Sequence, residues 1–302
     1  MAGYAVVVGA VNVDIWGQSF AEVIPQDSNP GLIRFAPGGV GRNIARNLAL
    51  LGTEVRMLTA LGDDFWASVL EDDLRRGGID ISGALRVPGA SSSSYLYISD
   101  PEGEMQLAVC DAEIVDRISP EYLAGKTDLL DRAEIVIPDG NLSGEAIGFL
   151  AENCRAPLFV DPVSVTKSRK FRSVLHRIHT IKPNAAEAFE LTGEHDPGKA
   201  ALALTEMGVR RAFVSDGSRG IYAAGEGKCI RVPCCTAKLR NCNGGGDAVM
   251  AALCRSHLLG FDLEKTARYA MAAGAIAVES AETISADMNE TNVLARMGRT
   301  TL

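Results

Sequence analysis

Short runs of apolar, often β-branched residues alternate with segments of helical periodicity along most of the chain. The expected strands are residues 4–8, 55–61, 135–137, 158–160, 180–181 and 212–214, and expected helices include 41–51 and 64–76, which end before glycines. Uninterrupted apolar strands of this kind are typical of parallel sheets that are buried on both faces. The pattern predicts an α/β protein, with a doubly wound, mostly parallel sheet and helices on both faces. We expect residues 1–302 to form one domain, because no repeat or linker interrupts the pattern.

Two segments break the alternation. Residues 95–99 and 105–110 alternate apolar and polar side chains around the turn Asp100-Pro101-Glu102-Gly103, which predicts an antiparallel hairpin. Residues 19–35 are polar and rich in turn formers. We expect segments of about 17–36 and 91–112 to form a small β-sheet that acts as a lid over one end of the domain. The alternative is an edge hairpin without a functional role.

Composition and charge narrow the class of protein. The 302 residues are 47% hydrophobic, and no apolar run approaches the length of about 20 residues that a membrane helix needs. The net charge of −8 disfavours a surface that coats nucleic acid. Seven cysteines without a C-x-x-C pair suggest reduced thiols, and the N-terminus lacks a basic region typical of a signal peptide. We therefore expect a cytoplasmic protein with a small-molecule partner, and no nucleic-acid or membrane partner.

The segment Asn241-Cys242-Asn243-Gly244-Gly245-Gly246-Asp247 precedes a predicted helix that ends at Gly260. Glycines at a helix start leave backbone N–H groups accessible at the positive end of the helix dipole, and this arrangement favours a phosphate. Asp247 could accept a proton from a hydroxyl group beside those donors. The alternative is that Asp247 only caps the helix and the glycines form a tight turn.

A second glycine-rich segment, Pro37-Gly38-Gly39-Val40-Gly41-Arg42-Asn43, leads into the predicted helix 41–51. Two glycines allow a ligand to approach the backbone, and the Asn43 amide can both donate to and accept from sugar hydroxyls. Asn12 and Asp14 follow the first strand at a spacing of two, so their side chains point to the same side. Each residue alone could equally belong to a turn or a cap.

The residues Gly193 to Ala200 imitate part of a nucleotide-binding P-loop. They match G-x-x-x-x-G-K, but Ala200 lacks the hydroxyl that would hold Mg²⁺. The segment follows a predicted helix rather than a strand, and Asp196-Pro197 is typical of a helix start. We assign no nucleotide role to Lys199.

Taken together, these segments resemble the ribokinase-like family of carbohydrate and nucleoside kinases, also called the PfkB family. Four motifs occur in the family's order over nearly the whole chain. They are Gly38 to Ala45 (GGVGRNIA), residues 182–187 (KPNAAE), residues 215–220 (SDGSRG) and residues 241–247 (NCNGGGD).

The resemblance implies an ATP-dependent kinase with Mg²⁺ and a role for each matching residue. Asp247 resembles the catalytic base, and the amides of Gly244, Gly245 and Gly246 resemble the anion hole. Residues that resemble the acceptor-binding set are Asn12, Asp14, Gly38, Gly39 and Asn43. Asn184 and Glu187 resemble the pair that positions Mg²⁺ and phosphates, while Ser215, Gly217 and Gly220 resemble nucleotide contacts. The hairpin resembles the family's lid, through which homodimers recur.

Some positions refine or depart from the family pattern. Asn141 stands where many sugar kinases of the family have an acidic residue, and its segment DGNLS suits a nucleoside-like acceptor. Lys167 is a candidate phosphate contact, although a solvated lysine at a helix start is an alternative. Asn241 and Cys242 replace the usual Asp and Thr. We expect phosphorylation of a primary hydroxyl on a ribosyl compound. A ribose- or fructose-like acceptor, and a catalytically impaired regulator that binds nucleosides, remain alternatives.

Overall fold

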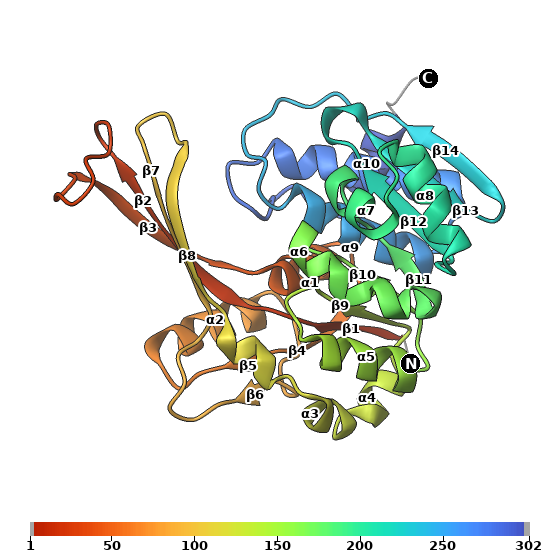
Figure 1. The fold of residues 1–302 in the computed structure, drawn as a ribbon, viewed down its shortest axis with the longest axis horizontal. Coiled ribbons are helices and arrows are strands. Elements are labelled where there is room, and N and C mark those ends of the chain that lie inside the picture. The colour runs from red at the N-terminus through yellow and green to blue at the C-terminus, as the bar shows by residue number, and fades with distance from the viewer. Residues whose placement is uncertain (1–2, 299–302) are drawn as a thin grey trace.

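An eight-stranded sheet forms the centre of the molecule (Figure 1), as seen in a computed structural model that describes residues 3–298. Its strand order is β14-β13-β12-β11-β10-β9-β1-β4. The neighbours from β4 to β12 are parallel, whereas β13 and β14 continue the sheet in antiparallel pairing. The expected doubly wound, mostly parallel architecture is therefore confirmed.

The elements have the following bounds. The strands are β1 (Tyr4–Val8), β2 (Asn12–Ser19), β3 (Gly31–Gly38), β4 (Glu54–Leu58), β5 (Ala60–Leu61), β6 (Leu85–Arg86), β7 (Ser94–Ser99), β8 (Met105–Asp111), β9 (Ile135–Pro138), β10 (Leu158–Val160), β11 (Ile178–Ile181), β12 (Arg211–Ser215), β13 (Ile221–Gly225) and β14 (Lys228–Val232). The α-helices are α1 (Val40–Leu50), α2 (Phe65–Arg76), α3 (Pro120–Ala124), α4 (Thr127–Asp131), α5 (Gly144–Asn153), α6 (Val165–Ser168), α7 (Ala185–Thr192), α8 (Pro197–Glu206), α9 (Gly245–Leu258), α10 (Leu263–Val278) and α11 (Glu290–Met297). Short 3₁₀ segments are η1 (Glu113–Arg117), η2 (Arg169–Arg177) and η3 (Gly217–Arg219).

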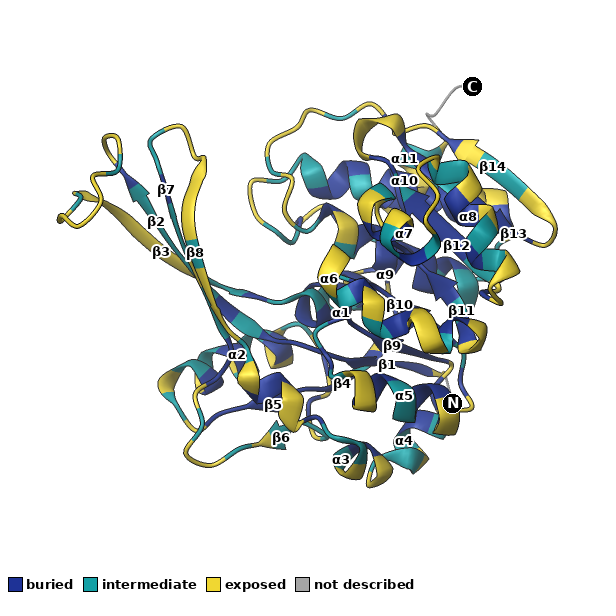
Figure 2. Cartoon of the chain, viewed as in Figure 1, coloured by how far each residue is buried: buried dark blue, intermediate teal, exposed yellow. Residues whose placement is uncertain are grey.

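Two apolar layers cover the central sheet. Alternate residues of β1 point to opposite faces, so Ala5 and Val7 pack in the layer with α1, α2, α9 and α10. Val6 and Val8 pack in the layer with α3, α5, α7 and α8. All four side chains are fully buried, and Figure 2 shows the central strands in the colour of buried residues. Burial on both faces explains why these strands are uniformly apolar.

A second sheet of four strands, ordered β3-β2-β7-β8, extends from one side of the molecule (Figure 1). We call it the lid sheet. The hairpin of β7 and β8 occurs as expected, but the first segment is longer than the predicted 17–36, because β2 begins at Asn12 and β3 continues to Gly38. Asn12 and Asp14 are therefore residues of the lid sheet itself.

The two faces of the lid sheet differ in chemistry. Cross-strand partners share a face, and the pairs Asp14 with Tyr95 and Trp16 with Tyr97 define a polar and aromatic face. The opposite face is aliphatic and aromatic, and its members include Ile15, Ile33, Phe35, Leu96, Ile98, Leu107 and Val109. Ile33 is 78% exposed and Phe35 is 62% exposed.

The expected strand 55–61 is divided in the structure. β4 ends at Leu58, and β5 leaves the central sheet to pair in parallel with β6. The Leu85 amide donates to the Thr59 carbonyl over 2.8 Å, so the chain changes partners at Thr59. The mostly apolar run did not reveal this change, because the apolar residues of both halves are buried. Within residues 3–298, no helix combines the length and apolarity needed to span a bilayer.

Candidate functional site

The predicted site residues gather at one edge of the central sheet, in the loops, helix starts and lid strands that lie beyond the carboxyl ends of the parallel strands. β1, β9, β10, β11 and β12 all end at this edge of the sheet, which is where α/β proteins bind their ligands. Residues from segments far apart in the sequence therefore meet here, and the amino end of α9 meets them.

The glycines of the 241–247 segment open α9, as predicted. Gly244 is the N-cap with a φ of 78°, in the left-handed region that favours glycine, and no side chain caps this helix. A Cβ atom on Gly244 would lie 2.6 Å from the Thr283 carbonyl oxygen. Gly245, Gly246 and Asp247 form the first turn, whose N–H groups lack partners within the helix. This end of α9 is a suitable place for an anion.

Asp247 makes a tertiary contact rather than acting as the N-cap. Its Oδ2 atom accepts a hydrogen bond of 2.9 Å from the Asn43 side-chain amide at the start of α1. Burial and, to a smaller extent, the nearby Asp161 carboxylate together raise the pKa of Asp247 to about 7, although Asn43 and Lys182 act in the opposite direction. A carboxylate that titrates near neutral pH can accept a proton during a reaction.

Four of the predicted acceptor-binding residues form one group around Asp14. The Asn12 amide donates to Asp14, and a Cβ atom on Gly38 would lie 2.2 Å from an Asp14 carboxylate oxygen. Gly39 has a φ of 97°, and a Cβ there would lie 2.6 Å from the Asn12 side-chain oxygen. Burial raises the pKa of Asp14 to about 6, although Arg42 and Asn12 act in the opposite direction. The structure thus brings Asn12, Asp14, Gly38 and Gly39 together beside the start of α1.

Arg42 orients Asn43, and our sequence analysis did not identify this role. The Arg42 guanidinium donates to the Asn43 side-chain oxygen over 3.0 Å and forms an ion pair of 2.8 Å with Asp73. Because the Asn43 oxygen is engaged by Arg42, its NH₂ group faces Asp247. An arginine within a ligand-binding motif was the signal available in the sequence, but its partner Asp73 lies in α2 and could not be identified from spacing.

Asn141 and Lys167 contact each other. The Lys167 ammonium donates to the Asn141 side-chain oxygen over 2.6 Å, and Lys167 is half-buried in α6. This contact disfavours the alternative of a solvated lysine. The loop of Asn141 also closely approaches the loop that follows β10, since a Cβ on Gly140 would lie 2.2 Å from the Pro162 carbonyl oxygen. The two side chains therefore form a hydrogen-bonded pair.

The residues on the predicted nucleotide side have local structural roles. Asn184 and Glu187 form a capping box at the start of α7, in which each side chain accepts a hydrogen bond of 2.9 Å from the other's backbone. Ser215 pairs with Asn184 in an isolated bridge. Gly217 and Gly220 have φ values of 54° and 106°, and a Cβ on Gly217 would meet open space.

Only one oxygen of the Glu187 carboxylate is available to a metal ion. Its Oε2 atom is used in the capping box, which leaves the other oxygen to reach a hydrated ion. Mg²⁺ commonly binds to one or two carboxylates together with waters and substrate phosphates. Among the residues that the structure describes, no cluster of three or more His, Cys, Asp or Glu side chains forms a protein-only metal site.

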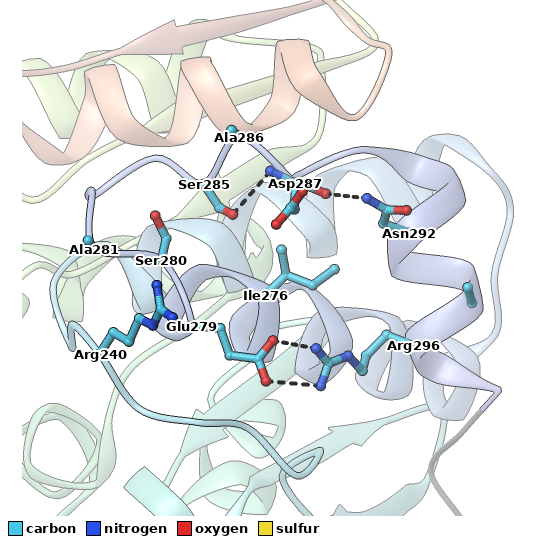
Figure 3. A pocket seen from close by; sticks show the side chains of 11 residues that line it. Arg240, Ile276, Glu279, Ser280, Ala281, Ser285, Ala286, Asp287, Asn292 and Arg296 are labelled. Carbon is cyan, nitrogen blue, oxygen red and sulfur yellow. Dashed lines mark hydrogen bonds and ion pairs between the residues drawn. The ribbon is translucent and has the colours of Figure 1, made fainter.

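A separate cavity of about 400 Å³ lies between α10 and α11 (Figure 3). Arg240, Ile276, Asp287 and the ion pair of Glu279 with Arg296 contribute to its lining. None of the predicted site residues lines it. Its wall adjoins the 241–247 segment through Arg240, whose amide donates to the Val278 carbonyl over 2.8 Å.

Comparisons with known proteins extend these observations. Residues 2–291 match the pfkB family carbohydrate kinase signature. The chain is 37% identical over 298 residues to pseudouridine kinase of Escherichia coli strain K12, covering 96% of this chain and 95% of that protein. It is 38% identical over 299 residues to the uncharacterized sugar kinase YeiI of the same organism, covering 94% and 82%. The structure of Arabidopsis thaliana ribokinase complexed with ribose and ATP superposes with a TM-score of 0.86 at 20% identity, covering 99% of this chain and 100% of that one.

Proposed function

The chain belongs to the pfkB family of carbohydrate kinases, and from this premise we propose that it transfers a phosphoryl group from ATP to the 5′-hydroxyl of pseudouridine. The coarser activity, phosphoryl transfer to an alcohol, follows from the family. One contact supports the proposal most strongly. The hydrogen bond between Asn43 and Asp247 joins the acceptor-binding group to the carboxylate at the amino end of α9.

The chemistry requires little covalent assistance from the protein. Asp247 takes the proton of the attacking hydroxyl, and the amides of Gly244 to Asp247 face the negative charge on the phosphoryl oxygens. Mg²⁺, when bound with ATP, neutralises phosphate charge, and Glu187 and Asn184 would hold it through water. Ser215, Gly217, Gly220 and Lys167 are our candidates for nucleotide and phosphate contacts.

The polar and aromatic face of the lid sheet supports a nucleoside acceptor. The rings of Trp16 and Tyr97 are nearly parallel, at 5°, with centroids 6.3 Å apart, and Tyr95 lies 5.9 Å from Tyr97. These rings share their face with Asp14, the candidate sugar ligand. Closure of the lid sheet would place a flat apolar surface against a planar base and exclude water from the site. Free ribose has no base to occupy that surface.

The opposite face of the lid sheet supports assembly as a homodimer. Exposed apolar residues on it, including Ile33 and Phe35, form a continuous surface of the kind that a partner covers. We propose that a second copy of the chain packs there. Light scattering on the purified protein tests this assembly, with Ile33→Glu as the disruptive variant.

A screen of ADP release across pseudouridine, uridine, other nucleosides, ribose and fructose tests the proposed function. We expect pseudouridine to give the highest kcat/KM. Higher efficiency with ribose or fructose would favour a sugar kinase, an alternative that the similarity to YeiI supports. If no acceptor in the screen supports ADP release, a nucleoside-binding regulator would be favoured, as the departures at Asn241 and Cys242 suggest.

A further inference from the structure

A buried ion pair lies beneath the first turn of α9. The Lys182 ammonium is 3.1 Å from an Asp161 carboxylate oxygen, and the two side chains are only 7% and 6% exposed. Lys182 follows β11 and Asp161 follows β10, so both stand at the edge of the sheet where the site lies. Removing two charges from water is costly, and apolar residues of similar size often replace such pairs without loss of stability. The pair therefore requires an explanation beyond stability.

The ammonium group of Lys182 lies against the predicted anion hole. A Cβ atom built on Gly246 would be 3.4 Å from Lys182 Nζ, so the backbone at Gly246 and the lysine are in direct proximity. The same ammonium experiences the negative charges of Asp247 and Glu187. Lys182 thus stands among the residues assigned to the base, the anion hole and the metal.

Asp161 is held rigidly by the turn that follows it. Its Oδ1 atom accepts a hydrogen bond of 3.0 Å from the Val163 amide, which leaves Oδ2 for Lys182. Val163 has a φ of 69°, a conformation that is rare for a β-branched residue and persists only where surrounding contacts enforce it. Asp161 can therefore hold the Lys182 ammonium in a fixed position.

We propose that Lys182 is a catalytic residue whose ammonium contacts the transferring phosphoryl group, and that Asp161 is its positioning residue. This inference rests on the proposed kinase function. In the reaction, the bond between phosphorus and the acceptor oxygen forms while the bond to the ADP oxygen breaks, and the hydroxyl proton goes to Asp247. Lys182 exchanges no proton, because its contribution is positive charge beside the phosphoryl oxygens.

Four variants separate this role from a purely structural ion pair. Lys182→Met removes the charge at similar length, and Lys182→Arg restores it. The double variant Asp161→Asn with Lys182→Met removes both charges, so that no buried charge is left unpaired. Lys199→Met is the matched control, because Lys199 is an exposed lysine that we assign to no site. Each variant is assayed for kcat with ATP and pseudouridine, for ADP affinity and for melting temperature.

We expect Lys182→Met to lower kcat by about 100-fold or more, the scale seen when one donor to a developing anion is removed. ADP affinity should change little, because ADP lacks the transferring group. The double variant should recover the melting temperature without recovering kcat, and Lys182→Arg should recover part of kcat. A double variant with kcat within about threefold of wild type would overturn the inference. Inactivity of the wild-type protein toward every acceptor would instead refute the proposed function.

Discussion

The acceptor side and the nucleotide side of the site are built differently. On the acceptor side, two side-chain hydrogen bonds fix the candidate ligands, one from Asn12 to Asp14 and one from Asn43 to Asp247. On the nucleotide side, Asn184 and Gly217 are exposed, and the described contacts there are mainly helix caps and backbone bridges. The acceptor is therefore met by a largely preformed polar site, whereas the nucleotide meets backbone loops. Specificity for the acceptor is expected to exceed specificity for the base of the nucleotide.

The largest expected effect comes from Asp247, where the two sides meet. Asp247→Asn should lower kcat by roughly 10²- to 10⁴-fold, because it removes the base with little change in volume. ATP affinity should be nearly unchanged. Turnover within a few-fold of wild type would contradict the assignment.

We also expect Asp247→Asn to change how the stability of the fold depends on pH. The pKa of Asp247 in the folded protein, about 7, lies above its ordinary value of 3.8, so the folded state binds this proton more tightly than the unfolded chain. Ionisation of Asp247 therefore destabilises the fold progressively as the pH rises from about 4 to 7. Asp247→Asn should melt at or above the wild-type temperature at pH 8, and the difference should shrink toward pH 4. Calorimetry across this range provides the measurement.

Acceptor preference tests how closely the preformed side fits its ligand. Pseudouridine has a ring N–H group that uridine lacks, and an acceptor atom paired with it would stay unpaired when uridine is bound. Such a loss costs about 1 to 3 kcal/mol, so we expect kcat/KM for pseudouridine to exceed that for uridine by about ten- to a hundredfold. The candidates for this contact lie in β7 and in the Asp139 to Asn141 loop. Equal efficiency with the two nucleosides would show that the site does not read this group.

A pair of variants separates the two sides directly. Asn43→Ala should raise the acceptor KM by about tenfold, because it removes the proposed hydrogen bond to an acceptor hydroxyl, while the ATP KM stays near its wild-type value. Ser215→Ala should have a smaller effect, confined to the ATP KM, because Ser215 lies on the nucleotide side, where it pairs with Asn184. Parallel changes in both KM values for either variant would show that the two sides are coupled rather than distinct.

The smallest expected effect concerns monovalent cations. In the family that the sequence resembles, many members are activated by K⁺ bound near the carboxylate at the position of Asn241. Here the Asn241 oxygen accepts from the Asn243 amide over 2.9 Å, and its NH₂ group donates to the Ala281 carbonyl over 3.3 Å. A neutral side chain engaged in this way offers little to a cation. Replacing an inert cation by K⁺ at constant ionic strength should change kcat by less than about twofold, and a strong rise would identify other ligands.

The sequence predicted the elements whose signals are local. The three glycines and the helical pattern after them were sufficient to place the start of α9, and apolar runs identified the central strands. A capping box could also be read from Asn184 and Glu187, although we gave them only ligand roles. The family resemblance predicted the acceptor-binding residues, and the structure brings Asn12, Asp14, Gly38 and Gly39 together.

Features that depend on distant partners could not be predicted in the same way. The ion pairs of Arg42 with Asp73 and of Lys182 with Asp161 join residues that are distant in the chain and meet only through tertiary packing. The early start of the lid sheet was missed because Asn12 and Asp14 are polar, and polar residues next to a strand are typical of a loop. Both omissions lie at the site, where burial of polar groups departs from the usual pattern.

The central claim is that Asp247 must be ionised to accept the proton, and the pH dependence of kcat/KM for pseudouridine tests it most directly. This quantity reports ionisations of the free enzyme. Because the pKa of Asp247 is raised to about 7 and that of Asp14 to about 6, log kcat/KM should be level above pH 7. It should fall with a slope of one just below pH 7 and more steeply below pH 6, and Asp14→Asn should remove the steeper part. A profile that stays level from pH 8 down to pH 5 would contradict the account.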